Sequence, residues 1–201
     1  SNNMIGGNFI GINSAGTPNP NGTGVKVSGS GNYIGTNGDG VGDGWEFNII
    51  SANTGMGIDV ISGGSGTIIA GNIIGLKSGA NEAAGNGLDG ILVGGVNNVR
   101  IGTNGDGVSD GWEGNNIGAN GFHGIRIDTG YGHKISGNII GVGVNGVVLG
   151  NGRSGIQLGP SVSDSTIGTD ESNPTYNPSE RNIISGNLNS GIDLQGYLVR
   201  V

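Results

Sequence analysis

The chain alternates apolar and polar residues in a short unit that recurs along its whole length. Each unit is a glycine followed by two aliphatic residues with one variable residue between them. The alternation has a period of two, which is that of a β-strand with one buried face. The six units occupy residues 24–27, 57–60, 90–93, 124–127, 155–158 and 191–194, at steps of 33, 33, 34, 31 and 36 residues.

Two more short apolar segments separate successive units. One ends in Ile-x-x-Asn, as at residues 34–37, and the other reads Asn-Ile-Ile, as at residues 48–50. No segment sustains a 3.6-residue periodicity, so we expect almost no helix. Three short strands per repeat of ~33 residues, separated by Gly, Asn and Ser, predict an all-β parallel solenoid of about six coils.

A longer period of 67 residues lies over the shorter one. Residues 34–46 and 101–113 carry nearly the same phrase, and an eroded third copy begins at Ile167. We therefore predict one β-helix domain over residues 1–201, with super-repeats at roughly 1–66, 67–133 and 134–201. Neither end shows the polar cap that terminal repeats need, so we expect a segment of a longer repetitive protein or a subunit that stacks end to end.

Coils that stack in register place equivalent residues in columns. The first strand then has two inward aliphatic columns, with one outward column between them. The outward column reads Lys26, Asp59, Leu92, Arg126, Gln157 and Asp193. A further column of turn residues, with amides that ladder from coil to coil, comprises Asn53, Asn86, Asn120, Asn151 and Asn187.

The GNIIG and GIxV phrases and the recurrent Asn resemble the right-handed parallel β-helix repeat family of pectate-lyase-like proteins, over the full length. The resemblance implies a right-handed solenoid, and polysaccharide lyases of this fold pair calcium with an Arg or Lys base. Arg100, Arg126 and Lys134 are available, with His123 and His133 nearby. An active site needs a unique constellation, whereas this chain is short, acidic and nearly repeat-symmetric. We therefore assign no catalytic residue and keep lyase activity as the alternative.

Composition narrows the classes of partner. Glycine supplies 48 of 201 residues, and the net charge is −7 with only 8 Lys and Arg. That charge disfavours nucleic acid and anionic membranes as partners. No apolar run of about 18 residues exists, so we expect no membrane insertion. We predict an extracellular or cell-surface location.

The 67-residue phrase carries a calcium-like pattern. Asn, Asp, Gly, Asp and Glu fall at positions 3, 5, 6, 9 and 12 of an EF-hand-type loop, a spacing that also resembles thrombospondin type 3 and dockerin repeats. Position 1, normally Asp, is a glycine in both copies. The alternative is that Gly, Asn and Asp only form turns and the acids lie in solvent. The predicted Ca²⁺ ligands are Asn37, Asp39, Asp43 and Glu46, and Asn104, Asp106, Asp110 and Glu113. The third copy, with Asp170, Glu171 and Glu180, is left open.

Trp45 and Trp112 are the two tryptophans of the chain and occupy equivalent loop positions. Stacked in register, they could form an aromatic platform for a sugar ring, or each could cap its own loop against the solenoid wall. We predict an extracellular structural or adhesive solenoid, stabilised by calcium, with copies of itself or neighbouring repeats as partners. The alternative is a carbohydrate-binding or polysaccharide-degrading module.

Overall fold

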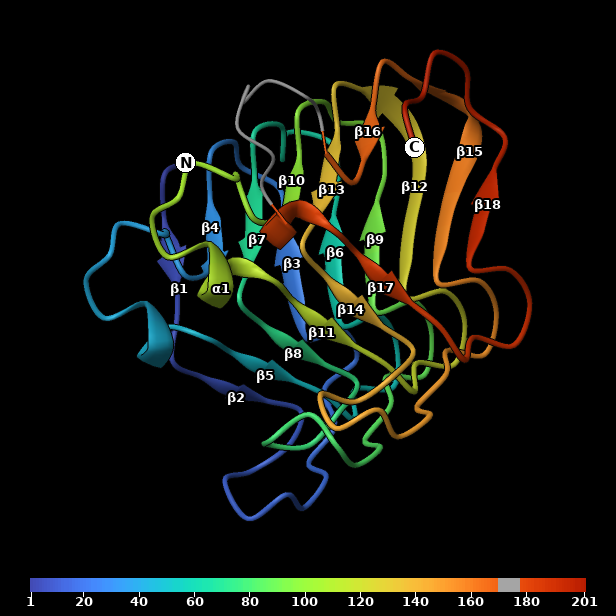
Figure 1. The fold of residues 1–201 in the computed structure, drawn as a ribbon. Helices are drawn as coiled ribbons and strands as arrows, with labels where there is room; N and C mark the ends of the chain where they lie inside the picture. Colours follow the sequence, from blue (N-terminus) through green and yellow to red (C-terminus); the bar gives the residue numbers. More distant parts are fainter. Residues whose placement is uncertain (170–177) are drawn as a thin grey trace.

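A computed structural model describes residues 1–169 and 178–201 and shows a parallel β-solenoid of about six coils (Figure 1). Each coil contributes one short strand to each of three sheets, and every strand pairs in parallel with its equivalents in the neighbouring coils. The predicted all-β solenoid, with equivalent strands ~33 residues apart, is confirmed.

The first sheet contains β1 (Met4–Ile5), β4 (Tyr33–Gly35), β7 (Ile68–Ala70), β10 (Arg100–Gly102), β13 (Lys134–Ser136) and β16 (Thr166–Ile167). The second contains β2 (Phe9–Ile10), β5 (Ile49–Ile50), β8 (Ile73–Ile74), β11 (Asn116–Ile117), β14 (Ile139–Ile140) and β17 (Ile183–Ile184). The third contains β3 (Val25–Val27), β6 (Ile58–Val60), β9 (Ile91–Val93), β12 (Ile125–Tyr131), β15 (Ile156–Ser163) and β18 (Ile192–Leu194).

Two kinds of insertion alternate between coils, as the 67-residue period predicts. Short helical turns follow β4, β10 and β16, namely η1 (Asp43–Trp45), α1 (Asp110–Glu113) and η2 (Pro178–Glu180). The intervening coils carry small antiparallel hairpins, closed by the pairs Ile12–Pro18, Leu76–Ala83 and Val142–Val148. Among the described residues, no helix is long and apolar enough to cross a membrane.

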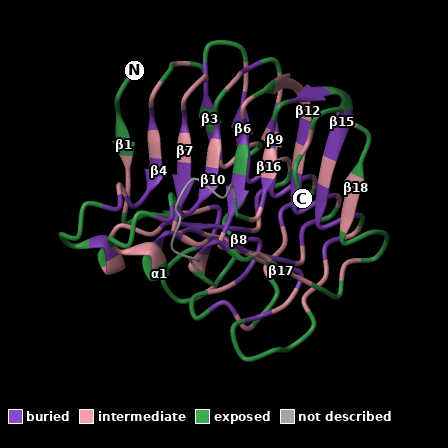
Figure 2. Cartoon of the chain, turned by 45° about the horizontal axis from the view of Figure 1, so that its top comes forward, coloured by how far each residue is buried: buried purple, intermediate pink, exposed green. Residues whose placement is uncertain are grey.

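The core is a stack of aliphatic side chains enclosed by the three sheets. The inward columns of the third sheet pair in the expected register, and Ile58, Ile91, Ile125 and Ile156 are completely buried. Figure 2 shows buried residues along the strands of the inner coils and exposed residues mainly in the loops. Stacked Ile and Val therefore replace the aromatic core that the composition lacks.

Two asparagine ladders run along the stack. In the predicted column, each Nδ2 donates to the Oδ1 of the next coil's asparagine at 2.8 to 2.9 Å. A second ladder, at 2.9 to 3.0 Å, comprises Asn8, Asn48, Asn72, Asn115, Asn138 and Asn182. These amides also bond to backbone groups, so the ladders satisfy buried polar atoms at the turns and hold the coils in register.

Glycine is required where the first sheet turns toward the loops. Gly35 and Gly102 have φ values of +97° and +99°, and a Cβ on either would lie 1.8 Å from the carbonyl oxygen of Ala70 or Ser136 in the next coil. Only glycine permits this conformation at so close an approach. The two loops therefore leave the wall at the same place in their coils.

Candidate functional site

The loops after β4 and β10 are built from turns that close on asparagine and aspartate side chains. Asn37 Oδ1 accepts from the Asp39 amide at 3.0 Å, and Asp39 Oδ1 accepts from the Val41 amide at 2.8 Å. The second loop repeats both bonds, with Asn104 and Asp106, at 3.1 and 2.7 Å. Such bonds are the usual role of Asn and Asp in turns.

The second aspartate of each loop links its loop to the loop above. The Asp43 carboxylate is buried, accepts from Thr36 Oγ1 at 2.6 Å and from the Gly40 amide at 2.9 Å, and is also bonded by Ser109 of the next loop. Burial alone would raise the Asp43 pKa, but these hydrogen bonds outweigh burial and hold the pKa below its usual value. Asp110 likewise accepts from the Gly107 amide at 3.2 Å and from Ser179 Oγ of the third loop at 3.3 Å.

Glu113 is the most deeply placed acid of the two loops. Its side chain is fully buried and pairs with Arg100 Nη1 at 3.0 Å, while Thr103 Oγ1 and the Asn104 amide donate to its other oxygen at 2.8 and 2.9 Å. The same carboxylate lies against Gly38 of the preceding loop, where any side chain would collide with it. Glu113 therefore holds its own loop closed and supports the loop beside it.

Glu46 occupies the equivalent position in the first loop but has fewer partners. The residue is half-buried, and among the described residues its carboxylate accepts one hydrogen bond, from the Asn37 amide at 3.3 Å. Tyr33 stands where the second loop has Arg100. The two loops are therefore repeats in shape but differ in the charge beneath them.

The predicted calcium ligands do not converge in this structure. Asp39, Asp43 and Glu113 each turn toward N–H or O–H donors of the loops. Across residues 1–169 and 178–201, no group of three or more His, Asp or Glu side chains could hold a metal ion. Calcium binding by these loops stays a prediction from the sequence. In the third loop Glu180 is buried, and Asp170 and Glu171 lie outside the described residues.

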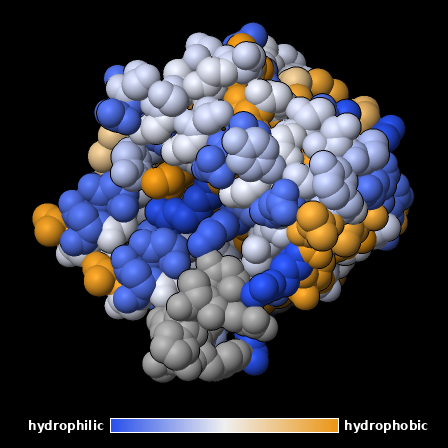
Figure 3. Space-filling view, turned by 90° about the horizontal axis from the view of Figure 1, so that it is seen from above, coloured by the Kyte–Doolittle hydropathy of each residue, from blue (hydrophilic) through white to orange (hydrophobic). Residues whose placement is uncertain are grey.

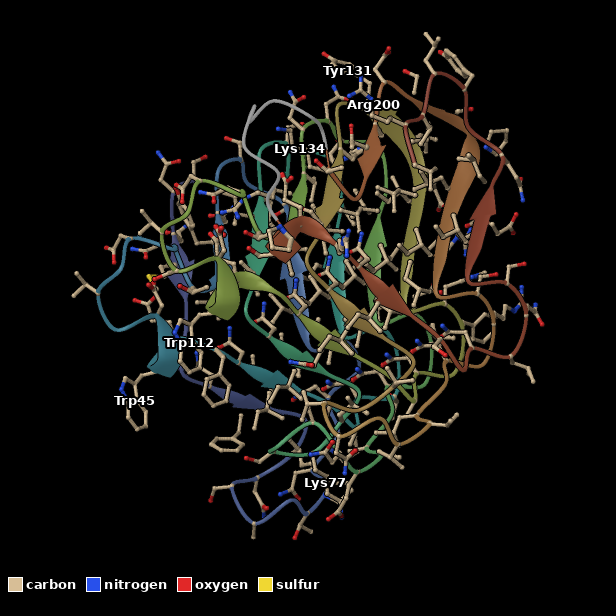
Figure 4. The ribbon with its side chains drawn as sticks, in the orientation of Figure 1. Trp45, Lys77, Trp112, Tyr131, Lys134 and Arg200 are labelled. Atoms are coloured by element: carbon tan, nitrogen blue, oxygen red, sulfur yellow. The ribbon has the colours of Figure 1, made fainter. Side chains whose placement is uncertain are left out.

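The two tryptophans lie on one face, beside η1 and α1 (Figure 4). Trp45 is 85% exposed and Trp112 is 62% exposed. The Trp112 ring packs on the backbone of Gly44, and both indoles line a hollow of about 490 Å³ between the loops. A smaller hollow of about 230 Å³, which includes Phe47, lies along Trp112. Neither indole is buried as a cap of its loop, so the face presents two aromatic surfaces to solvent.

The residues considered for lyase chemistry do not gather in one place. Arg100 pairs with Glu113, whereas Arg126 Nε bonds to Asp128 at 2.6 Å on the outer face of the third sheet. Lys134 lies on β13, beside Arg100 in register. Arg100 and Lys134 are therefore neighbours on the first sheet, whereas Arg126 lies on the third, so the three cations do not share one basic cleft.

The two histidines are buried at separate turns. Burial lowers the pKa of His133 to about 4, and His133 Nδ1 accepts from the Val99 amide at 3.3 Å. Burial also lowers the pKa of His123, which lies below the outer face of the third sheet. Both imidazoles are therefore neutral near pH 7.

Comparison with known proteins finds two solved structures that align with most of the chain. No protein-family model matches the chain, and no curated protein matches it. Among solved structures, a double mutant of the periplasmic alginate epimerase AlgG aligns at 17% identity and a TM-score of 0.43, over 92% of this chain and 37% of that one. The A-module of the Azotobacter vinelandii mannuronan C-5 epimerase AlgE6 aligns at 17% identity and a TM-score of 0.44, over 89% and 53%. The chain therefore spans about a third to a half of these structures.

Proposed function

We propose that this chain is a carbohydrate-binding β-solenoid of the extracellular space or cell surface, which holds a polysaccharide against Trp45 and Trp112. The observation that supports the proposal is the exposure of two indoles, 85% and 62%, at equivalent positions of stacked loops around one hollow. Large aromatic side chains left in water on one patch mark binding sites more often than scattered apolar residues do.

An exposed indole suits a sugar ring for physical reasons. The ring's axial C–H groups form an apolar face that covers the flat indole, while hydroxyl groups around the rim stay hydrated or reach polar loop atoms. The two loops stand two coils apart, which corresponds to about 9.6 Å at the usual strand spacing. A polymer with regularly repeating rings can therefore contact both indoles at once.

The charge of the chain favours a neutral polymer. With a net charge of −7, the protein repels an anionic polysaccharide at low ionic strength. Binding to a surface of neutral polysaccharide would also account for the structural or adhesive role that the sequence predicts. The proposal assigns recognition of the sugar and does not include a reaction.

Fluorescence titration gives a direct test, because Trp45 and Trp112 supply all the tryptophan emission of the chain. Neutral glucan, mannan, galactan and xylan hexasaccharides should be titrated against the protein and its Trp45→Ala and Trp112→Ala variants. We expect at least one hexasaccharide to change the emission. We also expect each variant to weaken binding about tenfold or more, equal to about 1.4 kcal/mol.

A matched control is Tyr131→Ala, which removes a 52% exposed aromatic side chain far from the loops (Figure 4). It should bind as the wild type does. The Trp45→Ala/Trp112→Ala protein has no tryptophan emission, so its affinity for the sugar is measured by calorimetry instead. Undiminished binding by the Trp45→Ala/Trp112→Ala protein, or the absence of binding to all four sugars, would reject the proposal.

Self-association is a second proposal, supported by apolar side chains exposed at the ends of the coil stack. Figure 3 shows such surface on the side where β15 and β18 lie. Its exposed members include Leu194, Tyr197 and Leu198. However, Arg200 already pairs in parallel with Thr166 of β16, where the first strand of a second copy would add. Residues 197–201 must therefore move for copies to stack in register.

Light scattering as a function of concentration tests self-association. The wild-type mass should rise with concentration, and Leu198→Asp should suppress the rise by placing a charge on the apolar end. A constant monomer mass up to millimolar concentration would exclude it.

A further inference from the structure

A polar hollow lies on the outer face of the third sheet, in the last three coils. It has a volume of about 270 Å³ and is lined by residues that include His123, Arg126, Arg153, Gln157, Asn189 and Asp193. Three of these come from the outward column of the sheet, because Arg126 pairs with Gln157, and Gln157 with Asp193, in adjacent strands. The stacking of the coils therefore sets the floor of the hollow.

A second column forms one wall. Arg153 and Asn189 each lie two residues after a ladder asparagine, and their backbones continue a column of parallel hydrogen bonds that starts in the turns below. Phe122 occupies the same position in the preceding coil, and the Arg153 guanidinium stacks over its ring, 4.5 Å from the centroid. This cation–π contact holds the guanidinium at the rim of the hollow.

Several polar groups of the hollow make no hydrogen bond with the part of the chain that the structure describes. The side chains of Arg153, Gln157 and Asn189 make no hydrogen bond or ion pair with the described residues. Arg126, by contrast, is held by Asp128 at 2.6 Å and faces Asp89 at 4.0 Å. The hydrogen-bonding atoms of Arg153, Gln157 and Asn189 therefore remain open to solvent beside the fixed Arg126.

A buried histidine also borders the hollow. His123 is 7% exposed, and its Nδ1 is buried without any hydrogen-bond partner in the described structure. Its backbone amide donates to Asp89 Oδ1 at 2.9 Å, which fixes the residue at the side of the hollow.

We propose that this hollow is a second carbohydrate site, which binds one neutral sugar unit through Arg153, Gln157, Asn189 and Asp193. A sugar hydroxyl both donates and accepts a hydrogen bond, so it matches guanidinium and amide donors beside a carboxylate and amide acceptors. The charges within and beside the hollow are two arginines against Asp89, Asp128 and Asp193. That balance disfavours an anionic ligand. The inference rests on the proposed function that the chain binds carbohydrate.

The second site belongs to a different part of the stack from the tryptophan face. The tryptophan loops follow β4 and β10, between the first and second sheets, whereas the hollow lies over β12, β15 and β18 of the third. One chain would therefore bind two segments of a polysaccharide and cross-link them.

Calorimetry with the hexasaccharide that binds most tightly tests the inference. We expect two sites per wild-type chain and one site in the Trp45→Ala/Trp112→Ala protein. Arg153→Gln and Gln157→Ala should each weaken the remaining site at least tenfold. Lys77→Gln is the matched control, because it removes a surface cation that pairs with Glu82 away from the hollow, and it should change neither site (Figure 4).

The outcomes separate the two proposals. Complete loss of binding in the double tryptophan variant, or unchanged binding by Arg153→Gln and Gln157→Ala, would overturn the second site and leave the tryptophan face standing. Wild-type binding at both sites in the double tryptophan variant would overturn the tryptophan face alone. A uronate hexasaccharide of the same length that binds more tightly, and loses affinity in Arg153→Gln, would overturn the neutral ligand class.

Discussion

Replacing Glu113 by glutamine should destabilise the protein strongly. The change leaves Arg100, whose side chain is only 13% exposed, without the carboxylate 3.0 Å away. The new amide NH₂ is a donor, and it would face groups that now donate hydrogen bonds to the carboxylate. These groups include Thr103 Oγ1 and the Asn104 amide. Breaking a buried ion pair from one side costs about 3–5 kcal/mol. At about 2–4 °C per kcal/mol for a protein of this size, we expect Tm to fall by roughly 6–20 °C.

Thermal unfolding followed by circular dichroism measures the effect, and Glu46→Gln is its control. Glu46 has the same place in the repeat, but it is half-buried and accepts one long hydrogen bond. Its loss should cost about 1 kcal/mol or less and lower Tm by no more than about 4 °C. Both variants and the wild type should be unfolded with millimolar calcium and again with excess chelator.

The same experiment separates this account from the calcium prediction. If Glu46 and Glu113 were bidentate calcium ligands, both variants would lose similar stability, and chelation would lower the wild-type Tm by many degrees. The hydrogen bonds and the ion pair of Glu113 form without a metal ion. They also predict different losses of stability for the Glu46 and Glu113 variants. Equal losses for the two variants, or a large effect of chelation, would refute the reasoning from the Arg100–Glu113 pair.

Three further predictions concern the scaffold. Burial lowers the His133 pKa from 6.5 to about 4, so the unfolded chain takes up a proton at higher pH than the folded one. The free energy of unfolding should therefore be highest above about pH 6.5 and fall by about 3 kcal/mol toward pH 4. Urea unfolding of His133→Asn should lack this component. Asn115→Ala removes four buried side-chain hydrogen bonds, two of them ladder bonds, and should cost about 3–5 kcal/mol in the same urea assay. Asn8→Ala, at the ladder's exposed end, should cost about 1 kcal/mol. Gly102→Ala should yield little folded protein on expression and gel filtration, because its Cβ would lie 1.8 Å from Ser136 O.

Much of the fold could be predicted from the sequence because a solenoid repeats each physical constraint. The Gly-aliphatic-x-aliphatic unit marks the third sheet in every coil, and the register of Arg126, Gln157 and Asp193 follows from it. One asparagine ladder was predicted from its spacing. The second was missed although Asn48 and Asn72 begin recognised Asn-Ile-Ile segments, because those residues were assigned to strands and not to turns.

The chemistry of the site was less accessible to sequence reasoning. The acids of the loops match a calcium spacing, but the spacing does not show which groups they bond to in the fold. Thr36 donates to Asp43, and Arg100 pairs with Glu113. Thr36 stands at position 2 of the motif, which supplies no ligand in an EF-hand-type loop, and Arg100 lies on β10 just before the second copy. Arg153 was likewise missed, although its place two residues after a ladder asparagine puts it directly over Phe122.

The repetition of the loops contributes directly to the proposed binding of a polysaccharide. Equivalent loops place Trp45 and Trp112 at a fixed pitch, which suits a ligand that is itself periodic. Contact with the first indole raises the effective concentration of the next ring at the second, so one polymer chain gains from both. A monosaccharide cannot bridge the two loops. Hexasaccharides should therefore bind much more tightly than the corresponding monosaccharide, and a single tryptophan substitution should remove most of that difference. Equal affinity for the two would mean that the indoles act separately and that their common pitch is only a consequence of the repeat.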